Sequence, residues 1–154
     1  MLKFQDDYTT SRYFVIDSFP LPVCKFGRVR YCRSFRTEGA NYGKCPSKKE
    51  TYFGFKVHAL ITLEDYISAF EITPASVDDR EELWDFAENH LNLVILGDKR
   101  YTGEALSTDM QNKGICLMSL KPSNYKKNWS TEIRRLIFRF RRRVERYSRS
   151  LAGS

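Results

Sequence analysis

The chain has 154 residues, of which 42% are hydrophobic and 29% charged, the composition of one ordinary globular domain. No apolar run is long enough to span a membrane, and the charged start of the chain does not predict a signal peptide. The formal net charge is +7, from 26 basic and 19 acidic residues, and it is unevenly distributed along the chain.

The first predicted strand is a short apolar run at residues 13–17 that ends on Asp17. Pro20 and Pro22 are expected to stop this strand, because proline cannot donate to a sheet ladder. Residues 24–50 then form a long connection rich in arginine and lysine. A connection of this length inside a compact domain is usually functional or mobile.

A hairpin is predicted next. Residues 51–61 alternate apolar and polar side chains, which is typical of a strand with one buried face. A turn at residues 64–65 leads to a second strand at residues 66–73. The two strands follow each other closely enough to pair directly.

The rest of the chain alternates helices and strands. The predicted elements are a helix that begins near residues 76–79, a strand at 93–98, a helix at 103–113, a strand at 115–120 and a final helix from about residue 131. The final helix carries an apolar stripe: Ile133, Leu136, Ile137, Phe140, Val144, Tyr147 and Leu151. This order of elements is that of a mixed α/β domain.

The charge is concentrated in two basic blocks. Residues 24–56 carry +7 and residues 121–154 carry +9, and they flank an acidic middle that carries −8. Blocks of this density favour a polyanion such as nucleic acid, although lysine and arginine also simply keep surfaces soluble. The four cysteines include no closely spaced pair, so reduced thiols in a cytoplasmic protein are expected rather than a disulfide scaffold or a zinc site.

Three carboxylates are candidate metal ligands. Asp17 and Asp98 each end a predicted strand, where sites gather in α/β sheets, although such a residue is as often a turn former or helix cap. Glu145 lies off the apolar stripe of the final helix, four residues after Arg141, with which it can equally form a surface ion pair. Held together by a fold, the three acids would supply oxygen ligands for two Mg²⁺ or Mn²⁺ ions.

Four motifs carry a family resemblance. They are Ile16–Cys24 (IDSFPLPVC), Lys48–His58 (KKETYFGFKVH), Leu96–Gly103 (LGDKRYTG) and Arg141–Glu145 (RRRVE). In this order they resemble the bacterial insertion-sequence DDE transposases, and the first motif is most similar to the insertion-sequence 982 family. The resemblance implies an α/β fold, a ribonuclease-H-like mixed sheet flanked by helices. This core would cover residues 12–151, after an N-terminal stub at residues 1–11.

The resemblance also implies a chemistry. Asp17, Asp98 and Glu145 would form an acidic triad that binds two Mg²⁺ (or Mn²⁺) ions, activates water to nick a transposon end, and then activates the freed 3′-hydroxyl to attack target DNA. The implied partner is double-stranded DNA at the bacterial nucleoid, in the cytoplasm and without a membrane, and a homo-oligomer is left open. The implied DNA-contacting positions are Lys48, Lys49, Lys56, His58, Arg141 and Arg142.

The chain departs from the family pattern in two ways. The family signature Tyr-x2-Arg-x3-Glu-x6-Lys corresponds here to Phe138, Arg141, Glu145 and Ala152, so its final lysine is missing. The helical N-terminal region and the long C-terminal tail of the family are also expected to be absent, which predicts a truncated core. Two alternatives to an active transposase therefore stay open: an inactive remnant that still binds DNA, and a plain metal-dependent nuclease.

Overall fold

Seven strands form one mixed sheet. They are β1 (Leu2–Lys3), β2 (Tyr13–Cys24), β3 (Asn41–Cys45), β4 (Glu50–Thr62), β5 (Ile67–Pro74), β6 (Val94–Gly97) and β7 (Cys116–Ser119). The helices are α1 (Arg33–Thr37), α2 (Asp79–Glu88), α3 (Glu104–Asn112) and α4 (Thr131–Leu151), with 3-10 turns η1 (Phe26–Tyr31) and η2 (Lys99–Tyr101). The computed structural model describes residues 2–3, 12–24, 26–45, 49–64, 66–88, 92–121 and 129–151, and only the backbone of residues 2–3, 26, 143–145 and 147–151.

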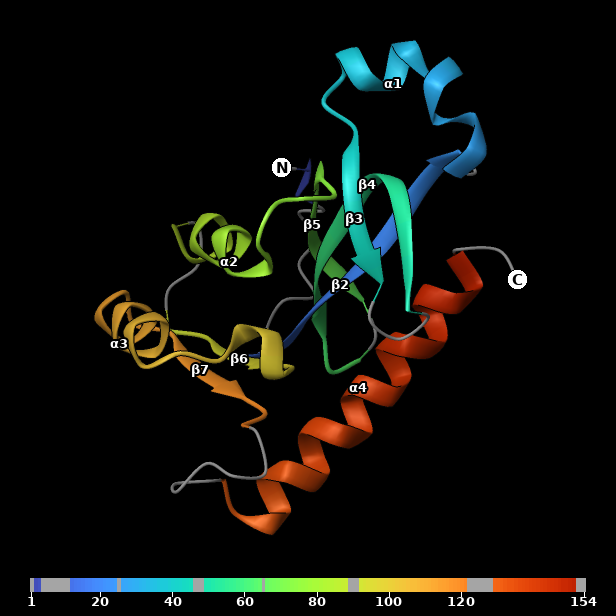
Figure 1. The fold of residues 1–154 in the computed structure, drawn as a ribbon. Coiled ribbons are helices and arrows are strands. Elements are labelled where there is room, and N and C mark those ends of the chain that lie inside the picture. Colours follow the sequence, from blue (N-terminus) through green and yellow to red (C-terminus); the bar gives the residue numbers. More distant parts are fainter. Residues whose placement is uncertain are drawn as a thin grey trace.

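The strand order in the sheet is β1-β5-β4-β2-β6-β7, with β3 paired to β4 (Figure 1). The hairpin β4–β5 is present as predicted, and β4 runs antiparallel to β2. On its other side β2 pairs with β6 in parallel, and β6 pairs with β7 in parallel. Antiparallel strands that continue into parallel strands, with helices on both faces, confirm the predicted ribonuclease-H-like α/β fold.

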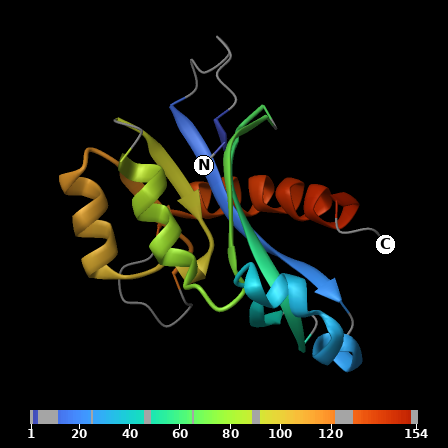
Figure 2. The same ribbon diagram turned by 90° about the horizontal axis from the view of Figure 1, so that it is seen from above.

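The helices cover the two faces of the sheet (Figure 2). Successive side chains of β2 point to opposite faces, so Ile16 packs on one side and Val15 on the other. On the Ile16 side the core includes Phe86 of α2 and Met110 of α3. On the Val15 side it includes Ile137 of α4.

The predicted final helix is confirmed, and its apolar stripe faces the sheet. Ile137 is 2% exposed and Phe140 8% exposed. The stripe's later members, Val144, Tyr147 and Leu151, have side chains outside the described part of the structure. None of the helices in the described residues is both long and apolar enough to cross a membrane.

The first strand is longer than predicted, because β2 continues through Pro20 and Pro22 to Cys24. The prediction that these prolines end the strand is wrong. β6 pairs with β2 only at residues 13–15, whereas β4 pairs with it as far as Cys24. Beyond the contact with β6, β2 is an edge strand, and an edge strand tolerates proline since the missing N–H is not needed for a second ladder.

The prediction that β4 has one buried face is also wrong. Ala59 and Ile61 are buried as expected, at 3% and 6% exposure. On the opposite face, however, His58 and Leu60 are both 0% exposed. This face is covered because α2, which begins at Asp79, packs over it.

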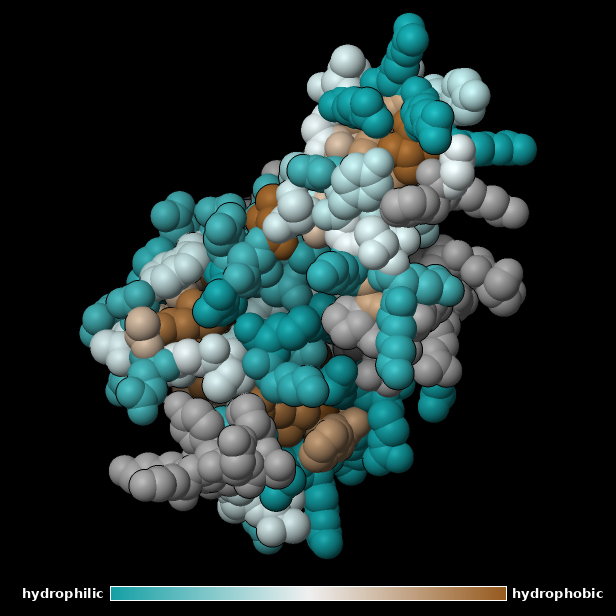
Figure 3. Space-filling model, viewed as in Figure 1, coloured by the Kyte–Doolittle hydropathy of each residue, from teal (hydrophilic) through white to brown (hydrophobic). Residues whose placement is uncertain are grey.

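The region interpreted as a long connection, residues 24–50, is folded over residues 26–45. The segments η1 and α1 lead into β3, which pairs with the start of β4. Val29, Ala40 and Phe53 form a small separate core beneath them, against which Cys24 and Cys32 pack as thiols. We call residues 26–40 the arginine lobe; it projects from one end of the molecule, and its visible surface is mostly hydrophilic (Figures 1 and 3).

Candidate active site

The structure brings Asp17 and Asp98 together. Val15 of β2 pairs in parallel with Leu96 of β6, so Asp17 and Asp98, each two residues further on, leave the paired segment at the same edge. Both are buried, at 6% and 5% exposure. Carboxyl ends of parallel strands are where α/β sheets form their sites.

A single arginine stands between these carboxylates. Nη2 of Arg100 lies 3.3 Å from Oδ1 of Asp17, and its Nε donates to Oδ2 of Asp98 at 2.9 Å. The third nitrogen, Nη1, lies 3.0 Å from Oδ2 of Asp79. The position of the arginine follows from the local turn, because the Asp98 side chain accepts from the Arg100 backbone N–H at 2.7 Å and caps η2.

Asp79 is a site residue that sequence reasoning missed. It is the first residue of α2 and only 7% exposed, and its Oδ1 lies 2.9 Å from Nζ of Lys56. In the sequence Asp79 belongs to a helix N-terminus, where an acid is explained by capping alone. No sequence signal distinguishes it from an ordinary cap, since its contacts with Lys56 and Arg100 depend on tertiary packing.

The electrostatics of the site favour an additional cation near Asp17. Burial is the main influence on the pKa of Asp17 and raises it from 3.8 to about 6, against the opposing effect of Arg100. Burial alone would lower the pKa of Arg100, but Asp98, Asp79 and Asp17 together hold it above its ordinary value. The guanidinium therefore stays charged, while the carboxylate of Asp17 is incompletely compensated.

The final helix reaches the same site through Arg141, whose Nη2 lies 3.6 Å from Oδ2 of Asp98. Glu145 lies one turn further along α4, and its side chain is outside the described residues. The described residues contain one group of three acids whose ligand atoms lie within 4.8 Å of one another, and it includes neither Asp17, Asp79 nor Asp98.

The predicted DNA-contacting residues divide into two groups. Lys56 and His58 lie inside the molecule: Lys56 also donates to the carbonyl of Val77 at 2.7 Å, and His58 Nε2 is 3.0 Å from the Thr73 hydroxyl. Burial lowers the pKa of His58 to about 4, so this ring is neutral at physiological pH. The remaining positions differ: Lys49 and Arg142 are exposed, Arg141 is half-buried, and Lys48 lies outside the described residues.

The close group of three acids is Glu71, Glu82 and Asp85, which sequence reasoning also missed. Glu82 is 6% exposed, and its Oε2 has no hydrogen-bond partner among the described residues. Burial, followed by the charge of Glu71, raises the pKa of Glu82 to about 7. This group joins β5 to α2 and shares no residue with the pair Asp17 and Asp98.

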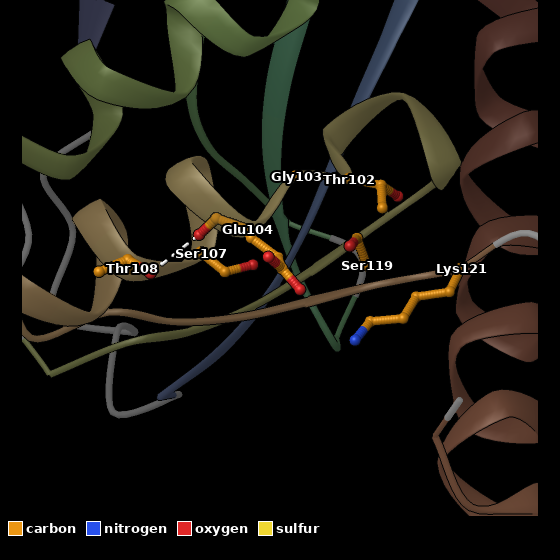
Figure 4. A pocket seen from close by; sticks show the side chains of 7 residues that line it. All are labelled: Thr102, Gly103, Glu104, Ser107, Thr108, Ser119 and Lys121. Carbon is orange, nitrogen blue, oxygen red and sulfur yellow. Dashed lines mark hydrogen bonds between the residues drawn. The ribbon is translucent and has the colours of Figure 1, made fainter. Parts of the chain in front are cut away.

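A shallow pocket of about 250 Å³ opens where α3 begins (Figure 4). Its walls carry hydroxyl groups, one lysine and one acid, from Thr102, Gly103, Glu104, Ser107, Thr108, Ser119 and Lys121. Neither Asp17 nor Asp98 lines it. The pocket is therefore separate from the candidate active site.

The fold and the buried acids at the end of two parallel strands define a ribonuclease-H-like domain with a carboxylate site. The chain matches the family described as "Transposase DDE domain" over residues 8–152, and it belongs to this family. No curated protein matches the chain significantly.

Two solved structures are similar to the chain in part. One is the piggyBac transposase synaptic complex with hairpin DNA, with a TM-score of 0.46 and 14% identity over 75% of this chain. The other is the large terminase nuclease of the thermophilic phage G20c with bound magnesium, with a TM-score of 0.30 and 19% identity over 68% of this chain. The chain spans 24% of the length of the first and 52% of the second.

Proposed function

We propose that residues 12–151 are the catalytic core of a DNA transposase that cuts transposon ends and joins them to target DNA by metal-dependent phosphoryl transfer. The observation that carries this proposal is the pairing of buried Asp17 and Asp98 around one cationic group. Membership of the Transposase DDE domain family supports it. The narrower assignment to the insertion-sequence 982 family rests on the motif at residues 16–24 and belongs to the same proposal.

The donor set fits a hard divalent cation such as Mg²⁺ or Mn²⁺. Asp17 and Asp98 offer buried carboxylate oxygens, and the guanidinium of Arg100 already lies between them as an internal cation. We assign Asp17, Asp98 and Glu145 as the residues that would hold two ions. Ions bound there would activate the attacking oxygen and stabilise the leaving oxygen.

Some of the surrounding basic residues would position the acids, and others would bind DNA. Lys56 fixes Asp79, which in turn retains Arg100 beside the site. Arg141 orients Asp98 from α4. The exposed Lys49 and Arg142, together with Lys48, would bind the phosphates of double-stranded DNA.

The test is nicking of a supercoiled plasmid that carries the DNA flanking this gene, with and without Mg²⁺. Asp98→Asn should abolish nicking while it leaves DNA binding in place, because it removes a metal ligand and no basic residue. Asp78→Asn is the matched control, since Asp78 is exposed and its one ion pair among the described residues is with its neighbour Arg80. Nicking that survives in the Asp98→Asn variant would refute the proposed site.

One observation favours a second candidate, an inactive remnant that binds DNA without cutting it. Arg100 contacts three carboxylates at once, in the place where metal ions would be needed. DNA binding without nicking at any concentration of Mg²⁺ or Mn²⁺ would support the remnant. Nicking without joining would instead indicate a metal-dependent nuclease.

A further inference from the structure

The arginine lobe presents an unusual concentration of positive charge. Arg28, Arg30, Arg33 and Arg36 are all exposed within nine residues of one another, and the lobe contains a single acid, Glu38. None of the four arginines forms an ion pair with any residue that the structure describes. Arg36 lies over the ring of Phe53, 5.9 Å from its centroid, which leaves its exposed guanidinium able to contact an anion. Arginine charges without a carboxylate partner among the described residues are available to an anionic partner.

These charges are held in place by a folded segment. Val29 is 4% exposed and Ala40 6% exposed, and both pack on Phe53 of β4 at 2% exposure. The backbone turns back at the end of α1, where Ala40 N–H donates to the carbonyl of Phe35 at 2.8 Å. A guanidinium carried by an anchored backbone loses less conformational freedom on binding than one on a flexible chain.

Exposed aromatic rings accompany the arginines. Tyr31 is 83% exposed and lies in the sequence between Arg30 and Arg33, and Phe35 on α1 is 45% exposed. No residue of α1 is buried. Rings interleaved with arginines are typical of surfaces that bind nucleic acid, where the rings can stack on bases or sugars. In the space-filling view the hydrophilic side chains of this end radiate from a small hydrophobic patch (Figure 3).

The distance between the lobe and the candidate active site can be spanned by a short DNA duplex. β2 extends from Asp17 to Cys24, where the chain enters the lobe. Seven residues at ~3.3 Å each place the base of the lobe about 23 Å from Asp17. At the ~3.4 Å spacing of nucleotides along each strand, this corresponds to roughly seven base pairs of duplex.

We propose that the arginine lobe is a DNA-binding element that holds the duplex flanking the site of cleavage, through phosphate contacts of Arg28, Arg30, Arg33 and Arg36. This inference rests on the proposed function, since it assigns the partner DNA to a second surface of the chain. It adds a contact region that lies outside the acidic site and outside the basic positions of α4.

Fluorescence anisotropy in EDTA, with a labelled duplex of about 30 base pairs or roughly three helical turns, measures binding without cleavage. Arg28→Gln/Arg33→Gln should bind roughly tenfold more weakly, and its slope of log Kd against log salt should fall by about 2, at ~0.9 per phosphate contact. The control Arg12→Gln/Lys113→Gln removes the same charge at the opposite end of β2 and should leave the slope unchanged. Thermal melting followed by circular dichroism checks that both variants are folded.

The two proposals fail in different ways. If Arg28→Gln/Arg33→Gln still nicks DNA and its salt slope is unchanged, the lobe does not bind DNA, and the proposed active site is unaffected. A protein that neither binds nor nicks DNA would overturn both. Tighter binding of an RNA duplex of the same sequence would overturn the assignment of the lobe to DNA.

Discussion

Replacing Arg100 with glutamine should strengthen the binding of divalent metal to this chain. The Arg100 side chain contacts Asp17 at 3.3 Å and Asp98 at 2.9 Å. A metal ion that takes these oxygens must displace the guanidinium from both. The contact with Asp79 at 3.0 Å can remain, and it would keep the displaced arginine near the site.

The magnitude follows from the two contacts that metal binding breaks. A hydrogen bond to a charged group contributes about 1.5–3 kcal/mol. The Arg100 side chain is 36% exposed, so water replaces part of each contact, and we discount the sum to about 1–3 kcal/mol. At about 1.4 kcal/mol per tenfold change, Arg100→Gln should bind metal roughly tenfold more tightly, within a range of about 5- to 150-fold.

Isothermal titration calorimetry with Mn²⁺ measures this change directly. Arg80→Gln is the matched control, because Arg80 contacts Asp78 two residues earlier, as Arg100 contacts Asp98. This control should leave the Mn²⁺ affinity unchanged. Without metal, Arg100→Gln should also melt at a lower temperature, since buried carboxylates lose their counter-charge, and Mn²⁺ should raise its Tm more than it raises that of the wild type. Equal or weaker Mn²⁺ binding by Arg100→Gln would refute the idea that the arginine competes with metal.

Two further predictions concern stability. The pKa of Glu82 is raised from 4.5 to about 7. Its contribution to the free energy of unfolding is therefore fully present below pH 4.5 and is lost as the pH rises towards 7. The Tm of the wild type should therefore fall across this pH window, and the Tm of Glu82→Gln should change less. An equally steep fall of Tm with pH in Glu82→Gln would contradict this prediction. A Cβ at Gly54 would collide with the carbonyl oxygen of Leu21 and lie 2.9 Å from the backbone nitrogen of Val23. Gly54→Ala should cost about 1–3 kcal/mol in a denaturant melt, whereas Gly27→Ala, with nothing within 4 Å of the added carbon, should cost far less.

The spacing of apolar residues along the chain was enough to predict the final helix and the two strands that end on acids. The apolar stripe of the final helix faces the sheet at Ile137 and Phe140, because helical spacing alone determines which side chains share a face. Asp17 and Asp98 could be identified as a pair for a similar reason. Each ends an apolar run, and parallel strands bring such ends to one edge of the sheet.

Features that depend on contacts between segments far apart in the sequence could not be predicted in this way. Pro20 and Pro22 continue β2 because that part of the strand is paired on one side only, which no local pattern reveals. His58 and Lys56 alternate as surface residues would, yet α2 covers them. The role of Arg100 depends on carboxylates that come from β2, α2 and the end of β6.

We propose that Asp17, Asp98 and Glu145 together bind the metal ions on which DNA cleavage depends. The most direct measurement is an anomalous difference map from crystals of the chain soaked in Mn²⁺. Peaks are expected between Asp17, Asp98 and Glu145, with Arg100 turned away towards Asp79. Peaks confined to Glu71, Glu82 and Asp85, with Arg100 still bound to Asp17 and Asp98, would contradict it.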